Sequence, residues 1–128
     1  MKSLSTRNIK VCVETFYQEE ISQPENNEFM FAYRITIENQ SDETIKLVKR
    51  KWIITDAFGK ERMVEGEGVI GKQPVIEPDC FHQYVSGCHL KTEVGKMRGV
   101  YIMQRVKNDS YFEVEIPSFQ MTAPFKLN

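Results

Sequence analysis

The sequence predicts an all-β protein, built as a sandwich or barrel of eight or nine antiparallel strands. Apolar and polar residues alternate with a period of two along most of the chain, and helical periodicity is almost absent. Clusters of turn-forming residues separate the alternating runs at the spacing of β-hairpins. The 128 residues, 41% of them hydrophobic, are enough for one core, so we expect a single domain over residues 1–128.

The first strands are expected over residues 9–17 and 29–39, where apolar side chains occupy alternate positions. The polar segment between them contains Pro24 and predicts a loop. A turn at Asn39-Gln-Ser-Asp42 then leads to a strand over residues 45–54 that carries the single tryptophan.

Alternation breaks inside that third strand, at Lys49-Arg50-Lys51. The break predicts a β-bulge or a strand that leaves one sheet for the other. The basic residues here and nearby are expected to form a solvated hairpin face: Lys46, Lys49, Arg50, Lys51, Lys60 and Arg62. Asp56-Ala-Phe-Gly59 predicts a hairpin loop with Gly59 at a positive φ, and a short strand follows at Met63 and Val64.

The second half predicts an extended segment over residues 74–79 and strands over residues 81–88 and 95–103. Residues 112–116 alternate most clearly; Pro117 is expected to end that strand, and residues 119–123 to form a last edge strand. The long strand, the polar turn and the tryptophan-bearing strand together indicate an immunoglobulin-like or fibronectin-type sandwich, whose two sheets pack about 10 Å apart.

Gly66-Glu-Gly-Val-Ile-Gly71 has the glycine spacing of a dinucleotide-binding loop. That loop needs a helix behind it, and Pro74 and Pro78 block one. The glycines therefore fit turns or bulges better. The alternative is an anion nest, in which the backbone amides from Gly66 to Lys72, those of Gly68 and Gly71 among them, hold phosphate, and Lys72 together with Arg62 balances its charge.

Two acidic residues beside these glycines oppose the anion nest. Glu65 and Glu67 are two positions apart and are expected to share a strand face. Their carboxylates would repel phosphate unless a divalent cation such as Mg²⁺ lay between them.

Composition excludes several classes of protein. The net charge is −1 and both halves are balanced, so no basic stripe for nucleic acid is expected. No apolar run is long enough for a membrane helix, and the N-terminal residues show no secretory signal. We therefore expect a soluble, cytoplasmic protein that does not insert into membranes.

The cysteines and histidines do not form a recognisable reactive or metal-binding motif. Three cysteines are too few and too scattered for a disulfide framework, and no spacing matches a zinc or calcium motif. Cys80 and His82 could share a strand face but lack an orienting group, whereas Cys88 and His89 point to opposite faces. We expect no catalytic residue, no metal site, no cofactor and no enzymatic activity.

In the order and spacing of several short motifs, the chain resembles the ApaG family from about Val11 to Met121. The stretches that carry the resemblance are Phe31-Ala-Tyr33, Trp52-Ile-Ile-Thr-Asp56, Val64-Glu-Gly-Glu-Gly-Val-Ile-Gly71, Gln73-Pro74, Tyr84-Val-Ser-Gly87, Met97-Arg-Gly-Val-Tyr-Ile-Met103 and Phe112-Glu-Val-Glu-Ile-Pro117. The resemblance implies an immunoglobulin/fibronectin-III-like β-sandwich.

For function, the resemblance implies a non-enzymatic binding or regulatory protein associated with cobalt resistance, magnesium efflux and divalent-cation homeostasis. It would act through an unidentified protein partner, and its influence on efflux would be indirect. The alternative is a small-ligand binder that recognises nucleotide or pyrophosphate, with or without Mg²⁺, at Gly66–Gly71. Exposed edge strands would allow a homodimer.

Overall fold

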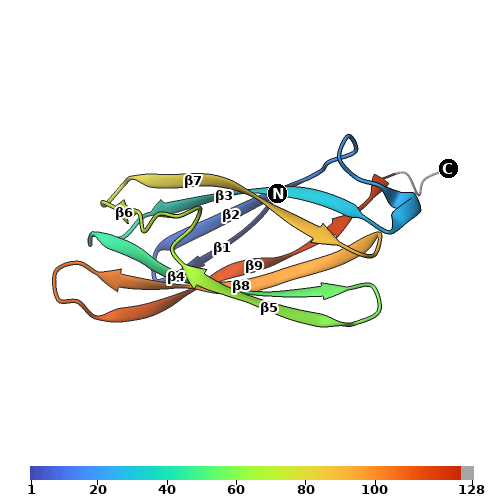
Figure 1. Cartoon of the computed structure of the whole chain (residues 1–128). Coiled ribbons are helices and arrows are strands. Elements are labelled where there is room, and N and C mark those ends of the chain that lie inside the picture. Colours follow the sequence, from blue (N-terminus) through green and yellow to red (C-terminus); the bar gives the residue numbers. More distant parts are fainter. Residues whose placement is uncertain (125–128) are drawn as a thin grey trace.

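The structure is a computed structural model that describes residues 1–124, and two antiparallel sheets pack face to face in it (Figure 1). The first sheet has the order β1-β2-β3-β7, and the second has the order β5-β4-β8-β9 with the short β6 also paired to β4. The strands are β1 (Lys2–Thr6), β2 (Ile9–Tyr17), β3 (Phe29–Asn39), β4 (Ile45–Asp56), β5 (Glu61–Glu67), β6 (Val75–Ile76), β7 (Phe81–Leu90), β8 (Val94–Arg105) and β9 (Tyr111–Thr122). A 3₁₀ turn at Pro24–Asn26 lies between β2 and β3.

The core lies between the sheets, where alternate residues of each strand point inward. Every odd-numbered residue of β3 is buried, as the sequence predicts for a half-buried strand. Trp52 of β4 packs edge-on against Tyr33 and Phe119, with ring centroids 5.5 and 5.9 Å apart. These rings join the two sheets across the middle of the sandwich.

Two expectations about strands were wrong. β1 was not predicted, because its residues are largely exposed and show no apolar alternation; pairing with β2 forms the strand. Pro117 does not end a strand, because β9 continues past it with a register shift opposite Met97 and Gly99. β9 is an edge strand, so the missing Pro117 N–H need not break a sheet hydrogen bond.

The break in alternation at residues 49–51 is a β-bulge, and β4 stays in one sheet. Its register against β8 shifts between Leu47 and Lys49. Leu47 and Arg50 therefore both lie opposite inward-facing residues of β8, Met103 and Tyr101. The bulge turns the Arg50 side chain toward the space between the sheets.

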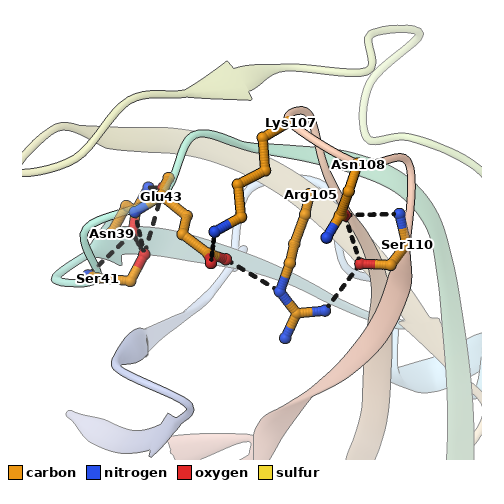
Figure 2. Close-up of polar contacts among 7 residues, drawn as sticks. All are labelled: Asn39, Ser41, Glu43, Arg105, Lys107, Asn108 and Ser110. Carbon is orange, nitrogen blue, oxygen red and sulfur yellow. Dashed lines mark hydrogen bonds and ion pairs between the residues drawn. The ribbon is translucent and has the colours of Figure 1, made fainter.

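A polar network closes the end of the sandwich where the β3–β4 turn meets the β8–β9 hairpin (Figure 2). The Glu43 carboxylate accepts hydrogen bonds from Lys107 Nζ at 2.6 Å and from Arg105 Nε at 2.9 Å. Arg105 Nη1 also donates to Ser110 Oγ at 3.1 Å. The hydrogen bond from Lys107, together with both positive charges, holds the pKa of Glu43 below its usual value. We call these residues the Glu43 network.

Candidate functional site

A cleft opens between β7, the edge of the first sheet, and the β4–β5 pair of the second sheet. Its volume is about 250 Å³, and an adjoining pocket of about 130 Å³ shares Tyr33, Arg50 and Ser86 with it. The other lining residues of the two are Trp52, Ile54, Arg62, Val64, Val69, Ile70, Gly71, Tyr84, Gly87, Cys88, His89 and Met97. Among the described residues that line this cleft, none is acidic.

Arg50 is the central charged group of the cleft. Its Nη1 donates to the carbonyl oxygen of Gly68 at 2.9 Å and to that of Glu67 at 3.3 Å. Within residues 1–124 it has no carboxylate partner, and its Nε and Nη2 make no hydrogen bond. A guanidinium group has five N–H donors, so most of the donors of Arg50 remain available.

Arg62 of β5 is a second guanidinium group at the same cleft. It lies opposite buried Ile54 in the β4–β5 register, so its side chain starts on the inner face of the sheet. Its Nη2 donates to the carbonyl oxygen of His89 at 2.6 Å and lies 3.9 Å from Cys88 Sγ. Arg62 thus ties the edge strand β5 to β7, also without a carboxylate partner in the described chain.

Tyrosine hydroxyl groups face Arg50 from the core. Tyr84 Oη and Tyr101 Oη are 2.6 Å apart and share one hydrogen bond. Burial raises the pKa of Tyr33, Tyr84 and Tyr101, and the Arg50 charge partly offsets this rise in each. All three groups therefore stay protonated at neutral pH and can donate hydrogen bonds.

The three glycines of the Gly66–Gly71 loop serve different structural needs. A Cβ atom at Gly66 would lie 2.8 Å from Arg50 Nη1, so this glycine leaves room for the guanidinium group. A Cβ at Gly68 would lie 1.9 Å from the carbonyl oxygen of Lys72, and its φ is +57°. Gly71 has a φ of +72° and open space around it. The glycine spacing thus shapes a turn that holds Arg50, and no helix follows it.

The structure also shows where the loop amides of the predicted phosphate nest point. The N–H of Gly68 donates to the Val48 carbonyl at 2.8 Å, and that of Lys72 donates to the Val69 carbonyl at 3.0 Å. Gly66 lies within β5 and pairs with Arg50 across the sheet. Two of the four predicted loop residues therefore have amides with partners in the protein: that of Gly68 anchors the loop to β4, and that of Lys72 closes the turn.

Glu65 and Glu67 share the opposite, outer face of β5, as their spacing predicts. Both lie opposite outward-facing lysines of β4, and the Glu65 carboxylate is 3.4 Å from Lys49 Nζ. Their carboxylates therefore do not oppose an anion inside the cleft. The expectation that all the basic residues near position 50 form a solvated face was wrong for Arg50, which the bulge directs inward.

The cysteines and histidines remain scattered. All three cysteines are free; Cys88 is buried, and burial raises the pKa of its thiol, with Arg62 opposing that rise. Burial lowers the pKa of His82, and the positive charge of Lys72 lowers it further. In the part of the chain that the structure describes, no group of three or more His, Cys, Asp or Glu residues could hold a metal ion.

A separate apolar groove of about 630 Å³ lies on the outer face of the second sheet. Leu4, Ile53, Met63, Val100 and Ile116 give it apolar surface, and Lys51, Glu65, Arg98 and Glu115 add charge. The Met63 side chain is 64% exposed. We call this surface the outer groove.

The fold and these two surfaces define a small all-β sandwich domain. The protein-family model for the ApaG domain matches residues 19–105. Protein ApaG of Brucella abortus is 48% identical over 124 residues, covering 97% of this chain and 95% of that protein, and Protein ApaG of Brucella anthropi is 50% identical over 119 residues, covering 93% and 91%. The crystal structure of the putative ApaA protein from Bordetella pertussis superposes with a TM-score of 0.87 at 37% identity, covering 91% of this chain and 94% of that one. The chain belongs to the ApaG domain family.

The described residues contain no helix that is long and apolar enough to cross a membrane.

Proposed function

We propose that this ApaG-domain protein is a non-enzymatic binding module of the cytoplasm that acts through a protein partner in divalent-cation homeostasis. The partner would be a transporter or a regulator of cobalt and magnesium efflux, in line with the family resemblance. The observation that carries the proposal is the outer groove, because its apolar lining is open to solvent. Large exposed apolar patches with polar rims are typical of interaction sites.

The composition of the outer groove suits a protein partner. Ile53, Met63 and Val100 come from three neighbouring strands and contribute apolar side chains to the lining. Lysine, arginine and glutamate residues of both signs surround it, which favours a partner with mixed charge over a polyanion.

The state of the buried thiol supports a binding role rather than an enzymatic one. A nucleophilic cysteine needs a lowered pKa and an adjacent base. Burial instead raises the pKa of Cys88, and His89, the next residue of β7, points to the opposite face of the strand. Cys88 therefore fits a small core residue.

The test is complementation of a deletion strain, scored by cobalt sensitivity and magnesium efflux. Met63→Glu places a charge in the outer groove, and Val85→Glu is the matched control on the outer face of the first sheet, where Val85 is 56% exposed. Both changes are at exposed sites, so both variants should fold. We expect M63E to lose complementation and V85E to keep it; equal complementation would remove the outer groove from the proposal.

Self-association is part of the same test. Sedimentation of the purified protein shows whether the partner is a second copy of this chain, joined through an exposed edge strand such as β5. A monomer in both the wild type and M63E leaves a different protein as the partner.

The second candidate function is binding of nucleotide or pyrophosphate near Gly66, Gly68, Gly71 and Lys72, with Mg²⁺ as an optional bridge. The observation that favours it is the Arg50 guanidinium group held against the carbonyl oxygens of this loop. Amide NMR shifts of Gly71 and Lys72 during titration with pyrophosphate or ATP test it directly. Unmoved amides at millimolar ligand would contradict binding at the loop.

A further inference from the structure

We propose that the cleft between β7 and the β4–β5 pair binds a phosphate group, with the Arg50 guanidinium as its main ligand. The inference rests on the second candidate function and changes its site, from the loop amides to side chains between the two sheets. Docking on the outer groove is independent of it, because that groove lies on the other face of the second sheet.

Charge is the first reason. Arg50 and Arg62 line one cleft of about 250 Å³, and the only acceptors they contact in the described chain are carbonyl oxygens and one sulfur atom. Arg50 is half-buried, so holding its guanidinium group between two sheets without a counter-charge costs free energy of solvation, whereas Arg62 is exposed and adds a second positive charge. A bound anion would compensate them, and a phosphate dianion matches two positive charges where a single carboxylate would match one.

An unpartnered donor is the second reason. Trp52 is only 2% exposed, and its Nε1 is buried with no hydrogen-bond partner among residues 1–124. Buried indole N–H groups usually find an acceptor. Trp52 lines the same cleft as Arg50, so a ligand bound there would lie against the side chain that carries this unpartnered N–H.

The hydroxyl groups give the third reason, because they too can act as donors. The Tyr84–Tyr101 pair uses one of its two hydroxyl protons for the bond between them. Tyr101 is fully buried and Tyr84 lines the pocket, so the arrangement in which Tyr101 donates leaves the Tyr84 proton for a ligand. Tyr33 and Ser86 are register partners across β3 and β7, and their side chains are hydrogen-bonded to each other, so this pair also has one hydroxyl proton left for a ligand.

Size limits the ligand. The cleft of about 250 Å³ and its adjoining pocket of about 130 Å³ together reach only the lower end of the roughly 300–1,000 Å³ that is typical of sites for drug-sized ligands. The cleft thus accommodates a phosphate or diphosphate group, and the remainder of a nucleotide would extend into solvent.

The local backbone holds Arg50 in this position by two separate devices. The bulge after Leu47 turns its side chain inward, and the missing side chain of Gly66 makes room for the guanidinium group. Bulges often occur beside functional sites, where they change the direction of a side chain.

The experiment is a titration read by fluorescence, because Trp52 is the only tryptophan of the chain and lines the cleft. The ligands are inorganic phosphate, pyrophosphate and ATP, each at constant ionic strength and without divalent cations. NMR of Trp52 Nε1–H and of the Lys72 amide is recorded in parallel. Arg50→Met is compared with Arg98→Met, which removes the same charge from the outer face of the same sheet.

We expect a saturable change at Trp52 in the wild type, unchanged affinity in R98M and at least about tenfold weaker binding in R50M. Saturation with inorganic phosphate assigns the cleft to the free ion. Saturation with pyrophosphate or ATP alone assigns it to the phosphate end of a larger ligand. Should R50M not fold, Tyr33→Phe and Ser86→Ala replace it, each expected to weaken binding by about threefold or more.

The inference is overturned by the absence of a saturable change at Trp52 with all three ligands, or by equal affinity in R50M and the wild type. Saturable shifts confined to Gly71 and Lys72, with Trp52 unmoved, would also overturn it while leaving the loop site of the second candidate function in place. The complementation assay with M63E is unaffected by any of these outcomes.

Discussion

Two pairs of basic residues lie at the boundary between the sheets, and only one pair has a carboxylate partner among the described residues. In the Glu43 network, Arg105 and Lys107 share one carboxylate (Figure 2). Arg105 also lies over the Phe112 ring, with its guanidinium carbon 4.4 Å from the ring centroid. In the cleft, Arg50 and Arg62 contact carbonyl oxygens and one sulfur atom instead.

The difference separates two roles for a positive charge. A cation whose charge is balanced within the chain fastens two turns together and has little left to offer a ligand. A cation that is anchored by neutral oxygen atoms keeps its net charge for an external anion. Substitutions that alter the cleft or the Glu43 network, one at a time, separate these two roles.

Gly68→Ala should have the largest effect on stability. The new Cβ would overlap the Lys72 carbonyl oxygen, and the residue has a positive φ. We expect the free energy of unfolding to fall by at least about 2 kcal/mol, measured by urea denaturation. Gly71→Ala is the control, since its φ is also positive but nothing lies nearby; it should lose only about 1 kcal/mol. Equal losses would mean that the close approach to Lys72 is unimportant.

Gly66→Ala should separate binding from folding. The added methyl group would meet the end of a flexible side chain, the Arg50 guanidinium group, rather than the backbone. We expect Arg50 to be displaced, so that phosphate binding weakens about tenfold while the free energy of unfolding changes by less than about 1 kcal/mol. Trp52 fluorescence titration and urea denaturation on the same sample measure the two quantities. Unchanged binding would show that the guanidinium position does not matter.

Glu43→Gln should alter stability in a pH-dependent way. The folded-state pKa of Glu43 is lowered, so its ionised form stabilises the fold above the unfolded-state pKa of about 4.3. That contribution is lost as the pH falls through the lower folded-state pKa. We expect E43Q to melt below the wild type at pH 7 and the difference to vanish under strongly acidic conditions, as followed by thermal scans. A pH-independent difference would show that charge pairing is not the cause.

The fold was largely predictable because apolar and polar residues alternate along the core strands. β3 alternates without a break, and the turn before β4 consists of short polar residues. β1 could not be predicted, because an exposed edge strand is formed by its partner and not by its own pattern. The expectation that Pro117 ends its strand was wrong for a related reason, since the effect of a proline depends on whether the strand lies at the edge of the sheet.

The cleft was predictable only in part. The break in alternation correctly indicated a bulge, but the sequence alone does not show which of three consecutive basic residues turns inward. That choice depends on the register against β8, a long-range pairing that no local pattern contains. The glycine spacing pointed to the Gly66–Gly71 segment as a phosphate loop. In the structure these glycines instead leave room for the Arg50 guanidinium group and form a tight turn.

Arg98→Met should have the smallest effect on stability and on phosphate affinity, and it is the reference with which the other variants are compared. Its Nη2 is 3.4 Å from Glu61 Oε2, and both side chains are more than half exposed. Solvent screens such a pair, so we expect the free energy of unfolding to change by less than about 0.5 kcal/mol and phosphate affinity to stay the same. A loss of affinity in R98M equal to that in R50M would mean that phosphate responds to net charge rather than to the cleft. An unchanged R98M beside a weakened R50M would show that position between the sheets, and not charge alone, distinguishes the two arginines.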